Sequence, residues 1–131
     1  MKHLLVIFVA LAALAACSQG TTPEEEAAKA ARAYYMRLAE GSPNDFVDGK
    51  VGADSMPADY RAQLLKACEQ YVAKLDAQHK GVREVCVSEN VGRRDTAQHL
   101  TYAFLLLCFN DSTREEITVP MVEVEGVWKM R

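Results

Sequence analysis

The apolar residues of this chain change their spacing once, near Gly81, and this change decides what the chain can fold into. After Gly81, Val85, Val87 and Val91 alternate with more polar residues and β-branched residues become frequent, which is typical of strands. Before it, apolar residues recur at the spacing of one helix face: Tyr60, Leu64, Cys68, Tyr71 and Leu75. Helices followed by strands predict an α+β fold with one domain.

Three helices are expected before Gly81. Thr22 as N-cap, Pro23 at the first helical position and Glu25 in a capping box mark the start of the first helix, and Gly41 ends it. A turn or two of helix follows before Gly49, and a longer helix runs from 55 to about 78. In the first helix, the residues expected to face the core are Ala27, Ala31, Tyr34 and Leu38.

Four strands are expected after Gly81, and the short connections between them predict an antiparallel meander. Pro120 interrupts the third strand where the apolar phase changes, which predicts a bulge that bends the sheet. The first connection would hold Arg93 and Arg94 at a hairpin tip. The expected strands are 82–91, 97–109, 114–124 and 127–131.

The second of these strands is apolar on both faces over residues 102–109, so both faces should be covered. Helices can cover one face. A second copy of the chain, giving a homodimer through the sheet, would cover the other, unless the strand curls so far that each face is buried in turn.

Besides Cys17, the chain has three cysteines, Cys68, Cys86 and Cys108, and they are spaced without a CxxC motif. No local scaffold for a zinc site is therefore visible, and no metal or cofactor is expected. The three cysteines are either small buried hydrophobes or supply one disulfide. The hairpin geometry places Cys108 opposite residue 81, roughly 17 Å along the strand from Cys86. This register excludes a bridge between Cys86 and Cys108, so any intrachain bridge should involve Cys68.

The first seventeen residues have the form of an export signal. Lys2 and His3 precede an apolar run from Leu4 to Ala16, which is shorter than the roughly 20 residues that span a bilayer. Leu14-Ala15-Ala16-Cys17 resembles the bacterial lipobox, which implies that Cys17 carries lipid. We therefore expect a signal peptide over 1–16, a lipidated cysteine and tether over 17–22, and one domain over 23–131. The alternative is a short buried helix with an incidental cysteine.

The order of these elements resembles the cone-shaped domains of the nuclear transport factor 2-like superfamily over residues 24–131. Tyr34-Tyr35-x-x-Leu38-x-x-Gly41 is similar to the first-helix pattern of small bacterial lipoproteins of unknown function in that superfamily, and Glu125-Gly126-Val127-Trp128-Lys129-Met130 to their closing strand. Ser18 after Cys17 favours the outer membrane over the inner one, by the sorting pattern of related lipoproteins. The resemblance implies a cleft between helices and sheet, but the superfamily includes isomerases, dehydratases, ligand binders and interaction domains.

A net charge of −3 and the lack of a basic cluster larger than Arg93-Arg94 argue against nucleic acid as a partner. The sequence contains no nucleophile elbow, no phosphate-binding glycine loop and no paired histidine ligands. We therefore expect a non-enzymatic, lipid-anchored envelope module that binds a small apolar ligand or a protein partner. The residues expected to line its pocket are Tyr34, Tyr35, Leu38, Tyr71, His99, Tyr102, Phe104 and Trp128.

Two alternatives stay open at this point. One is a small dehydratase- or isomerase-type enzyme in the cone, with acid–base groups from His99, Tyr102, Tyr34 and Tyr35. His99 and Tyr102 should point to opposite sides of their strand, which weakens them as a pair. The other alternative is a pure scaffold or dimerisation domain.

Overall fold

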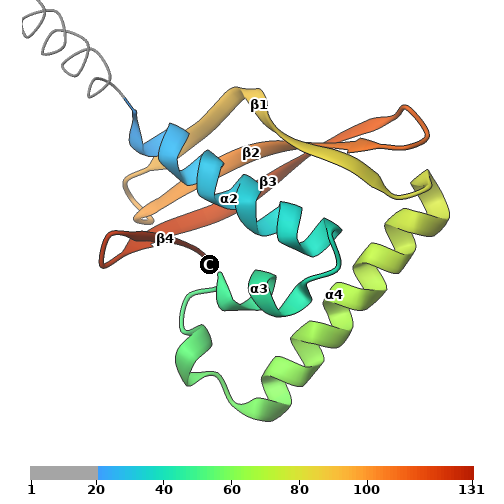
Figure 1. Ribbon diagram of the computed structural model, residues 1–131. Coiled ribbons are helices and arrows are strands. Elements are labelled where there is room, and N and C mark those ends of the chain that lie inside the picture. Colours follow the sequence, from blue (N-terminus) through green and yellow to red (C-terminus); the bar gives the residue numbers. More distant parts are fainter. Residues whose placement is uncertain (1–20) are drawn as a thin grey trace, which may run out of the picture.

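Four antiparallel strands lie side by side in their sequence order, and helix α2 crosses one face of the curved sheet (Figure 1). The computed structural model describes residues 21–131, so the predicted signal segment, Cys17 and the first part of the tether lie outside the described residues. The α+β fold with a four-stranded meander is confirmed. Its elements are α2 (Pro23–Ala39), α3 (Pro43–Asp48), the 3-10 turn η1 (Ala53–Ser55), α4 (Ala58–His79), β1 (Val82–Asp95), β2 (Leu100–Phe109), β3 (Arg114–Val124) and β4 (Val127–Met130).

Helix α2 begins and ends where its sequence signals predict. The Glu25 N–H donates to the Thr22 hydroxyl over 3.2 Å, which satisfies one free donor of the first turn. At the other end Gly41 takes the left-handed conformation, with φ 90°, that follows a helix C-cap. These caps fix the length of the helix that crosses the sheet.

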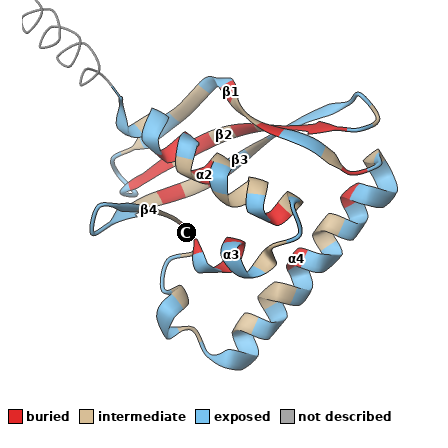
Figure 2. Cartoon of the chain, viewed as in Figure 1, coloured by how far each residue is buried: buried red, intermediate tan, exposed pale blue. Residues whose placement is uncertain are grey.

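The first half of α2 packs closely on the sheet because its inward side chains are small. Ala27, Ala28 and Ala31 are all fully buried. The Arg32 Nε–H donates to the Val85 carbonyl over 2.8 Å and so ties the helix to β1. Figure 2 shows that buried residues run along much of β2.

Helix α4 packs much more loosely, since Cys68 and Leu75 are its buried residues while most of its surface is exposed or half-buried (Figure 2). Its first turns lie against α3, where Arg61 Nη2 meets Asp48 Oδ1 at 2.8 Å. Tyr60, which we expected on the inward stripe, is 51% exposed, so that part of the prediction is wrong. The inward-facing residues of α4 therefore pack against the other elements only after the first turn of the helix.

Strand β1 is longer than predicted, and its register with β2 is irregular. Arg93 and Arg94 pair with Tyr102 and Thr101, so the prediction that they form a hairpin tip is wrong. The register shifts between Val82 and Glu84 and again between Val87 and Gly92. The second irregularity has a backbone cause: Val91 has φ 58°, and a Cβ at Gly92 would meet the Tyr102 carbonyl oxygen at 2.5 Å.

These shifts change the position of the cysteines. Cys108 lies opposite Glu84 and Cys86 lies opposite Leu106, so the two cysteines are diagonal neighbours on one face of the sheet. Their sulfur atoms lie within 4.8 Å of each other. The predicted separation of Cys86 and Cys108 is therefore wrong, because it placed the turn between the strands at 92–95, whereas the chain turns at 96–99. Both thiols, and that of Cys68, are free.

The predicted bulge at Pro120 is also wrong. The pairing of β2 with β3 is continuous, and Pro120 lies directly opposite Tyr102. The Pro120 carbonyl accepts the Arg131 N–H over 3.0 Å, so the proline nitrogen faces the end of β4 and the pairing of β3 with β2 loses no hydrogen bond. Val119 and Met121 are both buried, which shows that the alternation of inward-facing and outward-facing side chains continues across the proline.

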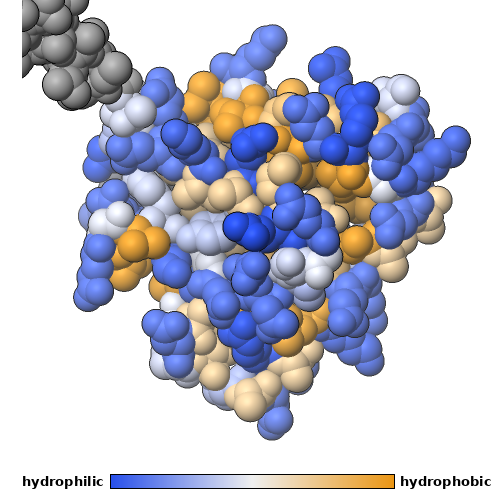
Figure 3. Space-filling view, in the orientation of Figure 1, coloured by the Kyte–Doolittle hydropathy of each residue, from blue (hydrophilic) through white to orange (hydrophobic). Residues whose placement is uncertain are grey.

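The two faces of β2 have different surroundings. Ala103, Leu105 and Leu107 point inward and are buried. On the other face Phe104 and Leu106 are half-buried. Figure 3 shows that, on the side seen in Figure 1, hydrophobic side chains form separate patches between hydrophilic ones. The homodimer through the outer face of the sheet stays a prediction.

Within residues 21–131, none of the helices combines the length and the apolar character needed to cross a bilayer.

Candidate functional site: an apolar groove beside helix α4

The loose packing of α4 leaves an apolar groove between this helix, α2, α3 and β3. The groove has a volume of about 350 Å³, and Lys50 contributes the charged side chain to its lining. The other lining residues are apolar, aromatic or sulfur-containing: Tyr35, Leu38, Phe46, Leu64, Ala67, Cys68, Tyr71 and Ile117. We call this site the α4 groove.

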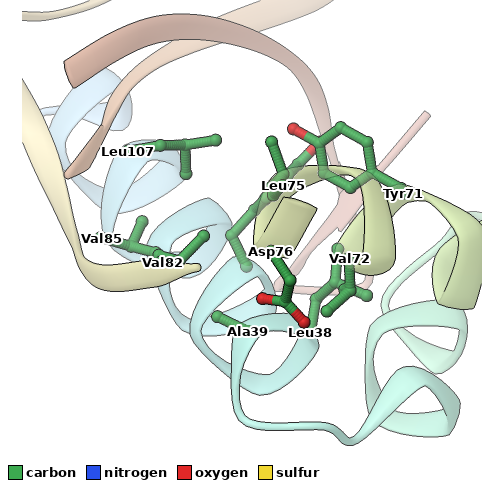
Figure 4. Close-up of a pocket in the computed structure, with 10 residues that line it drawn as sticks. Leu38, Ala39, Tyr71, Val72, Leu75, Asp76, Val82, Val85 and Leu107 are labelled. Carbon is green, nitrogen blue, oxygen red and sulfur yellow. The ribbon is translucent and has the colours of Figure 1, made fainter. Parts of the chain in front are cut away.

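A second, much smaller cavity shares Tyr35, Leu38 and Tyr71 with the α4 groove (Figure 4). Its volume is about 20 Å³, enough for about one water molecule. Leu75 from α4, Val82 and Val85 from β1 and Leu107 from β2 close it, and the Asp76 carboxylate points toward α2 (Figure 4). The space between helices and sheet is therefore filled beside β1 and open beside β3.

The sequence of α2 explains why the groove forms at one end of the helix. Its first half presents alanines and lies close to the sheet, whereas its second half presents Tyr35 and Leu38. The Tyr35 and Phe46 rings meet edge to face with centroids 5.1 Å apart, at 83°. This pair forms an aromatic wall of the groove where α2 meets α3.

The two tyrosines and the cysteine of the groove are held in their protonated forms. Burial, together with the neighbouring Tyr71 and Cys68, raises the pKa of Tyr35 to about 12. Burial and Glu115 raise the pKa of Tyr71. Burial raises the pKa of the Cys68 thiol, although Lys50 acts in the opposite direction. The groove therefore offers hydroxyl donors and a thiol rather than a thiolate nucleophile.

Lys50 supplies a positive charge at the wall of the groove. Its Nζ lies 5.5 Å from the centroid of the Phe46 ring, within the range of a cation–π contact. The backbone around it is fixed because Lys50 forms a parallel bridge with Met130. An apolar molecule with one acceptor or anionic group could contact the apolar wall and this ammonium at the same time.

Of the residues expected to line a pocket, Tyr35, Leu38 and Tyr71 line the α4 groove. Tyr34 points elsewhere: its hydroxyl donates to the Trp128 carbonyl over 2.6 Å. Tyr34 thus connects α2 to β4.

His99 and Trp128 line a different depression, near the start of α2, with a volume of about 410 Å³. Charged residues of both signs surround it, including Glu26, whose Oε2 accepts from Trp128 Nε1 over 3.4 Å, and Arg94. This depression is larger than the α4 groove but lacks its apolar wall, so we place the candidate site in the groove.

Tyr102 and Phe104 lie on the outer face of β2, away from the helices. The Arg93 guanidinium sits 5.3 Å from the centroid of the Tyr102 ring. The side chains considered for acid–base chemistry, His99, Tyr102, Tyr34 and Tyr35, are therefore not brought together.

Several groove residues were missed at the level of sequence. Phe46 and Lys50 come from the short α3 and the turn after it, and Ile117 from β3. Leu64 and Cys68 were on the expected stripe of α4, and their spacing with Tyr71 is the signal that could have located the groove.

The comparison with solved structures identifies the fold. The chain is similar to a crystal structure from Campylobacter jejuni described as a "Putative NTF2-like transpeptidase", with a TM-score of 0.58 over 76% of this chain and 92% of that chain. The chain has a nuclear transport factor 2-like fold. The identity between the two nuclear transport factor 2-like chains is 16%, so the likeness concerns the fold alone. No family model matches the sequence, and no curated protein matches it.

Proposed function

We propose that this chain is a non-enzymatic, lipid-anchored module of the bacterial cell envelope that binds a small apolar ligand in the α4 groove. The observation that carries the proposal is the groove itself, with its apolar wall and its few polar groups. Its volume, about 350 Å³, falls at the lower end of the roughly 300–1,000 Å³ of small-molecule sites.

The chemistry of the wall suggests the type of ligand. Tyr35 and Tyr71 are neutral donors, and Lys50 is a cation beside the Phe46 ring. A compact hydrocarbon or aromatic body with one carboxylate, sulfonate or carbonyl group would use all of these features.

Binding without chemistry is the function that best fits these groups. The Campylobacter jejuni structure is described as a transpeptidase, and acyl transfer of that kind needs an activated nucleophile. In the α4 groove, the sulfur that could serve has a raised pKa, which is the reverse of activation.

The proposal of a lipid anchor rests on the lipobox-like sequence that ends at Cys17. A lipid-modified cysteine with two or three acyl chains would hold the chain stably on a membrane, whereas one chain binds only reversibly. We expect Cys17→Ala to leave unprocessed or soluble precursor in detergent partitioning of the expressed protein. Cys68→Ala is the matched control. A Cys17→Ala variant that still partitions into detergent at the mature mass would disprove lipidation at this position.

The binding proposal is tested by titrating the protein with 1-anilinonaphthalene-8-sulfonate, which joins an aromatic body to an anionic group. Two exposed alanines of α4 offer a matched pair of substitutions, because Ala67 lines the groove and Ala62 does not. We expect Ala67→Trp to abolish the fluorescence increase and Ala62→Trp to leave it unchanged, with both proteins folded by circular dichroism. Equal binding by the two variants would refute the groove as the site.

Lys50→Met tests the preference for an anionic group. We expect this substitution to weaken binding of the sulfonate probe and to leave binding of a neutral probe such as Nile red unchanged. Equal losses for both probes would show that Lys50 supports the fold of the groove rather than the charge of the ligand.

A further inference from the structure

A cluster of three metal-ligating side chains lies on the outer face of the sheet, opposite the α4 groove. It consists of Glu84 and Cys86 from β1 and Cys108 from β2. Their ligand atoms, one carboxylate oxygen and two sulfurs, all lie within 4.8 Å of one another. We infer that these three residues form a binding site for a thiophilic divalent cation, with Zn²⁺ as the best fit.

The register of the sheet builds this cluster. Glu84 pairs directly with Cys108, and Cys86 pairs with Leu106, so all three ligands point to the same side of the ladder. The shift between Val87 and Gly92 is what brings Glu84 opposite Cys108, because a ladder continued regularly from Asp95 and Leu100 would place Cys108 opposite Val87. Backbone hydrogen bonds on both strands therefore hold the three ligands in place without any metal.

The distances fit a shared cation better than a disulfide. Diagonal neighbours across an antiparallel pair have Cα atoms about 7–8 Å apart, beyond the roughly 4.4–6.8 Å of most disulfides. Two sulfurs bound at about 2.3 Å to a tetrahedral Zn²⁺ lie about 3.8 Å from each other. At that typical diagonal distance, side-chain rotation can bring two sulfurs to this separation, whereas a disulfide bond would require the strands to move.

The burial of the ligands also suits a soft cation. Cys108 is 6% exposed, Cys86 is half-buried and Glu84 is exposed. The sulfurs would thus lie in the dry part of the site and the carboxylate at its mouth. Two thiolates and one carboxylate match the donor types that Zn²⁺ takes in proteins, and leave a fourth position open to water.

The neighbouring charges are compatible with this assignment. Arg114 pairs with Cys108 in the register of β2 with β3, on the same face as the cluster. Three anionic ligands around one Zn²⁺ leave one negative charge, which this guanidinium can offset.

The experiment is a Zn²⁺ titration of the purified, reduced protein in competition with a chromophoric chelator. We expect one tight site per chain, lost in Cys86→Ser and in Cys108→Ser and retained in Cys68→Ser, the matched control at the third free cysteine. Glu84→Gln should weaken binding by roughly tenfold or more, since loss of even a second-shell partner costs about 10- to 100-fold.

Co²⁺ in place of Zn²⁺ reports the ligands directly through thiolate-to-cobalt charge-transfer absorption. The wild type and Cys68→Ser should show this band, and the Cys86→Ser and Cys108→Ser variants should lack it while keeping their circular dichroism. Binding that survives in both serine variants would overturn the site. A Cys86–Cys108 disulfide that forms in air even with Zn²⁺ present would overturn it as well.

Discussion

The contact between Tyr34 and Gly49 offers a sharp test of how α2 is connected to the rest of the fold. A Cβ added at Gly49 would lie 2.5 Å from Cδ1 and from Cε1 of the Tyr34 ring. Carbon atoms in favourable contact are about 3.5–4.0 Å apart, so an alanine would overlap the ring by about 1 Å. The ring cannot turn away freely because its hydroxyl donates to the Trp128 carbonyl over 2.6 Å.

We therefore expect Gly49→Ala to destabilise the protein by about 1–3 kcal/mol, the usual cost of overpacking. The backbone at Gly49 has φ −77°, which alanine adopts without strain. Once the ring is removed by Tyr34→Ala, the same Gly49→Ala change should stabilise by about 0.4–1 kcal/mol, because it restricts only the unfolded chain. The sign of the effect should thus reverse with the background.

Urea unfolding followed by circular dichroism measures the four proteins of this double-mutant cycle. Gly126→Ala is the control, since Gly126 has φ 80° and open space around its Cβ position, so its cost should be the same in both backgrounds. The reasoning fails if Gly49→Ala has the same cost with and without the Tyr34 ring.

Three further substitutions test other contacts. Hydrogen bonds from Thr113 and the neighbouring His79 hold the pKa of Asp111 at about 2, below its ordinary value of 3.8. The stability that Asp111 contributes is therefore present above about pH 4 and lost as the pH falls toward about 2. Asp111→Asn should remove this part of the pH dependence of urea unfolding. Leu107→Ala, at a side chain only 2% exposed beside the small cavity, should cost about 2–5 kcal/mol and lower the melting temperature, and a smaller cost would mean that the cavity collapses. Ser88→Ala should cost about 1 kcal/mol in urea unfolding because its hydroxyl donates to a carboxylate on β3 over 2.7 Å, and an unchanged midpoint would show that water replaces this bond fully.

The helices could be predicted from the sequence because their signals are local. Thr22 and Gly41 act within one turn of the residues that they cap, and the inward alanines follow from spacing alone. The number, order and antiparallel pairing of the strands followed in the same way from short connections. Each of these inferences needs only residues a few positions apart.

The register of β1 with β2 could not be predicted because its signals mislead. Gly92-Arg93-Arg94-Asp95 has the composition of a turn, yet the chain turns at 96–99, a stretch without glycine or proline. His99 takes φ 55° there, and Val91, a β-branched residue, takes φ 58° within β1. Positive φ is uncommon outside glycine, above all at a β-branched residue, so the local sequence did not indicate it.

The same distinction separates the two proposed sites. Groove residues on α4 share one helix face, so the helical period places Leu64, Cys68 and Tyr71 together. The cluster of Glu84, Cys86 and Cys108 exists only in one register of two strands, and a search for closely spaced cysteines along the chain cannot find it.

The position of the groove along α2 has a consequence for access to it if the proposed anchor before Pro23 exists. Leu38 lies fifteen residues after Pro23, and at about 1.5 Å per residue this places the groove about 22 Å from the start of the helix. Figure 1 shows α4 near the opposite end of α2 from Pro23. A chain held at a membrane through residues before Pro23 would therefore keep the α4 groove away from the attachment point. A ligand could then enter from the aqueous side, which makes a soluble or partner-delivered apolar molecule a better fit than a lipid taken directly from the bilayer.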